Sequence, residues 1–280
     1  MKDKIYVWVN VLVFAVASII LMLDSVQIVQ AAESLWNGSL CIVMGTAVAV
    51  VALKGVRFYI ILVGYQMSVM EFLKQYFKVV VIGVVLPFKL GDLFRMYCFG
   101  KMLQNGSKGV VTVLLDRFSD TLALVTLLAG IGFIKYIRIP GVIVLLCAFL
   151  IGCIFLYRIF PELFSYWNHY FLQSNATARH LRCLALLAHM NHVYLEIQKT
   201  IQGRGFILYG ISILSWIIEA LGLYLFTSNQ SMSFVMVEHL TIALQGGASA
   251  YLSQFILCNV VLFFVAYICI QCRSVREKKG

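Results

Sequence analysis

The stretch Leu86-Pro87-Phe88-Lys89-Leu90-Gly91-Asp92-Leu93-Phe94-Arg95 places charges and helix breakers inside an otherwise strongly apolar sequence. A second charged stretch, Leu115-Asp116-Arg117-Phe118-Ser119-Asp120, follows it. The chain as a whole is 62% hydrophobic and 12% charged. An ionisable side chain near the centre of a bilayer costs about 2.5 to 3.5 kcal/mol on insertion scales. We therefore expect the charges kept in these two stretches to mark a functional site.

The composition predicts an all-α polytopic membrane protein, because soluble domains carry about twice this fraction of charged residues. Apolar segments recur along the 280-residue chain, so we expect a single integral membrane domain over residues 1–280. The net charge of +10 is spread between these segments. We interpret the basic residues as topology signals and contacts with anionic lipids, and we expect no nucleic-acid partner.

About six apolar runs are long enough to cross roughly 30 Å of hydrocarbon: Ile5–Leu23, Ser39–Leu53, Gly109–Ile134, Ile139–Tyr157, Gly205–Phe226 and Tyr251–Cys272. Two further stretches are interrupted by polar residues, and we expect two re-entrant or broken helical elements there. The first, residues 79–99, enters from the cytoplasm, and the second, residues 234–250, enters from outside. Discontinuous helices of this kind mark binding sites in transporters.

The distribution of the 22 Lys and Arg residues predicts that both termini are cytoplasmic. Most of them fall on cytoplasmic loops, including Lys54 and Arg57 after the second run, whereas Lys135 and Arg138 fall outside. The basic tail 273–280 is then cytoplasmic as well. The polar segment 160–204 is expected to form amphipathic helices on the cytoplasmic leaflet. The location that fits is the bacterial inner membrane.

The two charged stretches can meet in the fold. Asp116 and Asp120 share one face of a helix, and Arg117 points about 100° away. Asp92 and Arg95 are one turn apart and can also meet. We expect Arg95 to pair with Asp116 or Asp120 and Arg117 to face a polar cavity. Either these charges only neutralise one another and fix the packing, or Lys89, Arg95 and Arg117 form an anion site for a lipid phosphate.

Trp216 and Glu219 lie one turn apart in the fifth apolar run. A lone carboxylate in such a run usually faces the interior of the bundle. We expect Glu219 to point toward Lys89 or Arg95, and both structural pairing and direct substrate contact remain open.

Motifs for catalysis and metal binding are missing from the sequence. It contains no nucleotide-binding loop, nucleophile elbow or zinc-binding helix motif. Most of the eight cysteines lie in apolar runs, where Cys behaves as a small hydrophobe. His189 and His192 have no carboxylate or Cys at matching spacing. We therefore expect no enzyme activity, no catalytic residue, no metal and no cofactor.

The charged stretches resemble the transmembrane region of the bacterial lysylphosphatidylglycerol synthetase and flippase family, which also occurs as stand-alone membrane proteins. The family pattern of Pro, Gly with an acidic residue, Arg, and a span that opens on charged residues maps onto Pro87, Gly91-Asp92, Arg95 and 116–120. A Trp followed by Glu within a span matches Trp216 and Glu219. The later Gly-rich family segment is reduced here to Gln245-Gly246-Gly247-Ala248, with Glu238 upstream.

The resemblance implies that the chain moves a phospholipid or lipid-linked precursor between leaflets. Its partners would be membrane lipids, either an anionic phospholipid or a lipid-linked glycan, and lysyl transfer is not expected. The alternative is a non-transporting scaffold that docks a cell-envelope or polysaccharide enzyme through the segment 160–204. A flippase needs a hydrated groove near Arg95 and Arg117. The candidate substrate-binding residues are Lys89, Asp92, Arg95, Asp116, Arg117, Asp120, Trp216, Glu219 and Glu238.

Overall fold

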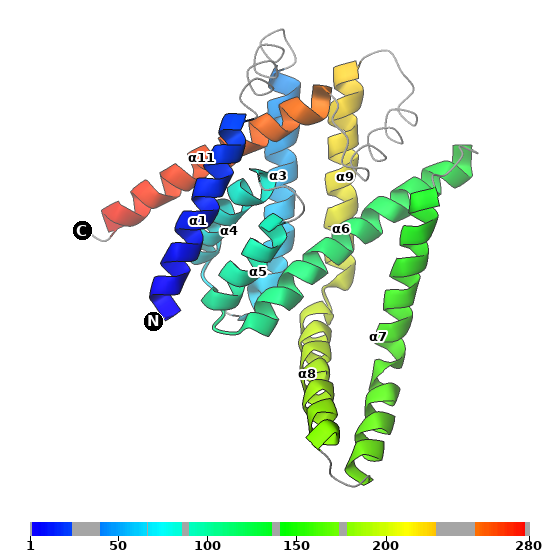
Figure 1. The fold of residues 1–280 in the computed structure, drawn as a ribbon. Helices are drawn as coiled ribbons and strands as arrows, with labels where there is room; N and C mark the ends of the chain where they lie inside the picture. Colours follow the sequence, from blue (N-terminus) through cyan, green and yellow to red (C-terminus); the bar gives the residue numbers. More distant parts are fainter. Residues whose placement is uncertain are drawn as a thin grey trace.

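The computed structural model describes residues 2–23, 40–65, 67–85, 90–135, 141–173, 178–227 and 250–277. Within these ranges the regular structure is helical and contains no strand, which confirms the all-α prediction (Figure 1). The elements are α1 (Lys2–Leu23), α3 (Leu40–Leu62), the short 3-10 helix η1 (Val63–Tyr65), α4 (Val69–Val85), α5 (Leu90–Met102), α6 (Gly106–Lys135), α7 (Gly141–Gln173), α8 (Ala178–Ile201), α9 (Gly205–Thr227) and α11 (Ala250–Glu277).

The bundle is organised around α3, which packs against α9, α6 and α11 (Figure 1). α6 runs obliquely across the bundle and also contacts α5 and α9. α4 packs between α5 and α11, and α1 lies against its outer side. This arrangement brings the N-terminal half of α5, the C-terminal half of α3 and the N-terminal half of α6 to one place in the bundle.

Three helical segments in the described part of the chain are long and apolar enough to cross a membrane: Cys41–Tyr65, Val144–Gln173 and Gly205–Phe226. Two shorter apolar segments, Val7–Ile19 and Gln254–Ile270, lie within α1 and α11. The described part of each of the six predicted spans is helical. α6 is long enough to cross, but Asp116, Arg117 and Asp120 interrupt its apolar character.

The predicted end of the second span at Leu53 was wrong, because α3 continues to Leu62. Lys54 and Arg57 therefore lie within the helix and not in a cytoplasmic loop. Arg57 is only 2% exposed. The prediction ended the span just before its first cation, Lys54. In the fold, carboxylates on α6 neutralise Arg57, so the helix can continue past this charge.

The predicted break in residues 79–99 is confirmed, since α4 and α5 are separate helices that pack against each other. The linking residues 86–89, with Pro87 and Lys89, lie outside the described residues. α4 begins earlier than expected because Ser68 caps it: the Ser68 hydroxyl accepts the Glu71 N–H at 3.2 Å and donates to the Glu71 carboxylate at 2.9 Å. Entry of this pair from the cytoplasmic side stays a prediction.

Glycines set the close approach of α4, α5 and α6. A Cβ on Gly91 would overlap the backbone of Gly83, so α4 and α5 touch at this pair. A Cβ on Gly109 would likewise overlap the backbone of Gly100, which places α6 directly against α5. The two contacts fix the register in which the charges of α5 face those of α6.

The polar segment 160–204 contains the end of α7 and all of α8, and its predicted place on the cytoplasmic leaflet stays a prediction. α7 runs without a break through Pro161 to Gln173, and α8 returns beside it. Tyr194 on α8 packs against Tyr157 and Phe160, with ring centroids 5.0 Å apart in both pairs. In Figure 1 this helical hairpin extends away from the rest of the bundle. The second predicted re-entrant element, residues 234–250 with Glu238, lies outside the described residues except for Ala250.

Candidate functional site

A cavity of about 240 Å³ opens among α3, α4, α5, α6 and α11. We call it the charged cavity, because its lining combines apolar side chains with an unusual number of charges. The charged lining residues are Lys54, Arg57, Asp92, Arg95, Asp116, Arg117 and Asp120. The lining therefore carries four cations and three carboxylates in the interior of an apolar bundle.

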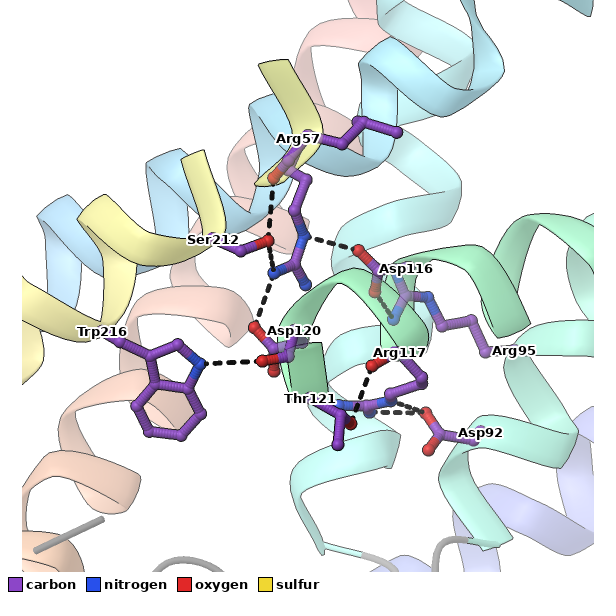
Figure 2. A network of polar contacts seen from close by, with 10 residues as sticks. Arg57, Asp92, Arg95, Asp116, Arg117, Asp120, Thr121, Ser212 and Trp216 are labelled. Carbon is purple, nitrogen blue, oxygen red and sulfur yellow. Dashed lines mark hydrogen bonds and ion pairs between the residues drawn. The ribbon is translucent and has the colours of Figure 1, made fainter. Parts of the chain in front are cut away.

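Arg57 is the centre of a buried polar network (Figure 2). Its Nε donates to Asp116 Oδ1 at 2.8 Å, and its Nη1 donates to Asp120 Oδ1 at 2.6 Å. Nη1 also donates to the Ser212 hydroxyl on α9 at 2.9 Å. One arginine on α3 thus ties α6 and α9 together, and this explains why the helix tolerates its charge.

Asp116 connects Arg57 to a second arginine. Its other oxygen, Oδ2, accepts from Arg95 Nη1 at 2.9 Å. The Arg95 guanidinium also lies over the ring of Phe58, with Cζ 3.8 Å from the ring centroid. The Arg95 side chain is 9% exposed, and its Nε has no hydrogen-bond partner among the described residues. A buried N–H donor thus remains available beside the charged cavity.

Arg117 and Asp92 form a second ion pair at the rim of the charged cavity, which we call the rim pair (Figure 2). Arg117 Nε and Nη2 donate to the same oxygen, Asp92 Oδ1, at 2.9 and 2.5 Å. The Arg117 side chain is 52% exposed, in contrast to the 2% of Arg57. This pair is accessible from outside the bundle, whereas the network around Arg57 is not.

Lys54 lies on the α9 side of the charged cavity. Its Nζ is 3.5 Å from Glu219 Oε2 and 5.2 Å from the centroid of the Trp216 ring. The Trp216 indole N–H donates to the backbone carbonyl of Asp120 at 3.3 Å. Trp216 and Glu219 are both buried, at 8% and 4% exposure. These two residues therefore support the cavity wall and balance the charge of Lys54.

The structure brings together most of the residues predicted from the sequence. The alternative in which Arg95 pairs with Asp116 is confirmed. Asp92 contacts Arg117 and not Arg95, so the expected contact one turn along the same helix was wrong. The Glu219 carboxylate lies 3.5 Å from Lys54 Nζ, a partner that the sequence did not predict. The predicted positions of Lys89 and Glu238 lie outside the described residues.

Sequence reasoning missed the role of Arg57, Lys54 and Ser212. The signal was present for Arg57, because it lies within a run of apolar residues that continues to Leu62. The rule that a charge inside an apolar span marks a site would have selected it. Ser212 gave no comparable signal, since serine is common in membrane helices.

The charged side chains of the cavity already have ion-pair partners in the described part of the chain, so a charged ligand that pairs fully with one of them must displace its partner. The rim pair is the accessible place for that exchange, because Arg117 is half-exposed and has a planar fork suited to phosphate. Among the described residues, no group of three or more His, Cys, Asp and Glu side chains could hold a metal ion.

Comparison with known proteins identifies a family. The family model described as the lysylphosphatidylglycerol synthase TM region matches residues 7–254. Neither the curated proteins nor the solved structures contain a match. The matched range includes every element that lines the charged cavity, apart from the part of α11 that follows Gln254.

Proposed function

Because the chain belongs to the family of the lysylphosphatidylglycerol synthase transmembrane region, we propose that it moves an anionic phospholipid or a lipid-linked precursor between leaflets. Family membership and the apolar helices identify a multi-pass membrane protein that acts in lipid modification or translocation. We further propose that it moves the lipid without converting it, in a bacterial inner membrane with both termini cytoplasmic.

One observation carries this proposal: a cavity lined by four cations lies inside a bundle whose outer faces are apolar. A headgroup phosphate cannot cross hydrocarbon cheaply by itself, because charges near the bilayer centre are costly. A protein that moves it must supply polar partners at that depth. The charged cavity supplies guanidinium groups, which bind phosphate through two parallel hydrogen bonds.

The rim pair gives the first step of the proposed exchange. Arg117 releases Asp92 and binds the headgroup phosphate, and this exchange costs less than one in the inner network because the Arg117 side chain is 52% exposed. Arg95 Nε, a buried donor without a partner among the described residues, then offers a further hydrogen bond to the headgroup. Arg57 and Asp116 stay in place as the wall of the cavity.

Transfer in reconstituted vesicles tests this proposal. The protein is placed in phosphatidylcholine vesicles that contain a fluorescent phosphatidylglycerol, and a membrane-impermeant quencher reports the lipid in the outer leaflet. We expect Arg117→Gln to lose most transfer, and Arg117→Lys to fold normally but transfer more slowly, because Lys keeps the charge and loses the fork. Arg158→Gln, on the exposed surface of α7, is the matched control. Unchanged transfer in both Arg117 variants would contradict the proposal.

A scaffold function has one observation in its favour. The α7–α8 hairpin exposes a group of aromatic side chains, with Tyr166 65%, Trp167 43% and Tyr170 53% exposed. Aromatic residues are common anchors in protein interfaces. If Trp167→Ala abolishes capture of a cell-envelope enzyme and leaves transfer intact, the hairpin has a docking role in addition to transport. If the wild type shows no transfer but captures such an enzyme, scaffolding is the main function.

A further inference from the structure

A second hollow, of about 450 Å³, lies among α3, α4 and α11 and adjoins the charged cavity. We call it the apolar groove. Its α3 wall includes Val48, Ala52 and Val56, its α4 wall includes Val69 and Leu73, and α11 closes one side with Leu262. None of the described residues that line it is charged. The groove can hold hydrocarbon and cannot hold a polar headgroup.

The apolar groove and the charged cavity share two lining residues, Val51 and Tyr76. Tyr76 is 4% exposed, and its ring stacks on Phe72 with centroids 5.2 Å apart. On its other side, the Tyr76 ring centroid lies 6.0 Å from Arg95 Cζ. One aromatic side chain therefore borders a cationic site and an apolar groove at the same time. A ligand that fills both hollows must be charged at one end and apolar at the other.

The length of the apolar groove agrees with a single lipid chain. It follows α4 from Val69 to Phe77, and at about 1.5 Å per residue this is about 12 Å. Half of a hydrocarbon core of about 30 Å is about 15 Å. The charged cavity continues along α4 from Tyr76 to Gly83. The groove therefore begins where the cavity ends, and its length is close to the depth of one leaflet.

Glycine at position 55 contributes to the open floor of the groove. A Cβ there would meet the Tyr76 ring at 3.5 Å, which is ordinary van der Waals contact. A larger side chain at this position would reach into the space beside Tyr76. The adjacent exposed positions Ala52 and Val56 also carry small side chains, so these three positions of α3 leave the groove open.

We propose that the apolar groove holds one acyl chain of the same lipid whose phosphate occupies the charged cavity. This inference rests on the proposed function and adds a site for the tail of the substrate. It also specifies the ligand class, because an anionic lipid with an acyl chain fills both hollows and a free phosphate or sugar phosphate fills only the cavity.

Photolabelling tests the groove directly. The probe is a phosphatidylglycerol with a diazirine in the middle of one acyl chain, added to phosphatidylcholine vesicles that contain the protein. We expect labelled peptides from residues 48–59 and 69–77 to exceed those from the equally apolar α9. The same probe chain on phosphatidylcholine should label these peptides severalfold less. Even labelling of all exposed helices, or equal labelling by the two headgroups, would overturn the proposal.

A blocking variant with a matched control completes the test. Val56→Trp fills the groove, and Val144→Trp makes the same change on α7; the two valines are 51% and 60% exposed. Val56→Trp should lower groove labelling and lipid transfer severalfold, whereas Val144→Trp should behave as the wild type. Ala52→Leu adds less volume and provides a second blocking variant if Val56→Trp does not fold.

These experiments distinguish a wrong assignment of the groove from a wrong proposal for the function. If Arg117→Gln stops transfer but both blocking variants transfer as the wild type, the groove assignment is wrong and the function stands. If the wild type does not transfer the lipid, the proposed function is wrong. Photolabelling then still shows whether the groove holds an acyl chain, because it detects the bound chain without any movement of lipid between leaflets.

Discussion

The strongest quantitative test of the site is Asp116→Asn. Asp116 is 2% exposed and accepts hydrogen bonds from two arginines, Arg57 and Arg95, one on each carboxylate oxygen. Asn has nearly the same shape but no charge, and it replaces one acceptor oxygen by an NH2 donor. That donor must face an arginine N–H. The substitution therefore leaves two buried guanidinium groups without an adequate counter-charge.

Removal of one partner from a buried ion pair destabilises a protein by about 3 to 5 kcal/mol. Asp116 serves two arginines, so we expect a loss of about 5 kcal/mol. This is a large part of a typical folding free energy of about 5 to 15 kcal/mol. Asp120→Asn should cost less, because Asp120 is 13% exposed and Arg57 keeps its bond to Asp116.

Asp92→Asn is the matched control, since it makes the same chemical change in the same charged cavity. Its partner Arg117 is 52% exposed and can turn toward other polar groups, so the loss of stability should be smaller than for Asp116→Asn. The three variants are compared by equilibrium unfolding in detergent micelles, followed by circular dichroism. The expected order of destabilisation is Asp116, then Asp120, then Asp92. If Asp116→Asn is no less stable than Asp92→Asn, the carboxylate of Asp116 faces water and the buried network is not formed.

Three further predictions follow from the geometry. Asp92→Asn removes the competitor for Arg117, so binding of phosphatidylglycerol in nanodiscs should tighten by up to about fivefold, which corresponds to about 1 kcal/mol; weaker binding would contradict the exchange at the rim. Gly109→Leu should sharply reduce the folded yield, because α5 lies against it, whereas Gly130→Leu on the same helix meets open space and should not; equal yields would refute the close contact. Cysteines introduced in residues 24–36 should react with an impermeant reagent from outside the cell and one at Lys278 should not; external labelling at Lys278 would reverse the predicted topology.

The location of the charges was predictable from the sequence because their cost in a membrane is a local property. Each of Asp92, Arg95, Asp116, Arg117 and Asp120 stands out against apolar neighbours, and all five line the charged cavity. The broken helix was predictable for the same reason. Pro87 and Gly91 interrupt the apolar run, and a hairpin is the simplest way to place both of its ends on the same side.

The pairing of the charges was not predictable, because it depends on how the helices cross. Spacing along one helix suggested a contact between Asp92 and Arg95. In the fold, Gly109 brings α6 so close to α5 that both residues find partners on α6 instead. The role of Arg57 in the site was missed for a related reason. Its partners are 59 and 63 residues further along the chain, so nothing near Arg57 indicated that its charge would be neutralised.

The sequence left two interpretations open: the charges only fix the packing, or they bind a lipid phosphate. The first applies to the inner part of the charged cavity and the second to its rim. Around Arg57, Asp116 and Arg95, the charges fix the packing, since breaking one of these pairs costs about 3 to 5 kcal/mol. At the rim, separating Arg117 from Asp92 costs less, because the Arg117 side chain is 52% exposed and the Asp92 side chain 15% exposed. A lipid headgroup that binds by exchange should therefore take Arg117 first. The inner arginines then act on it as a fixed positive wall, so a variant that removes Arg117 should prevent transfer while the inner network and the fold persist.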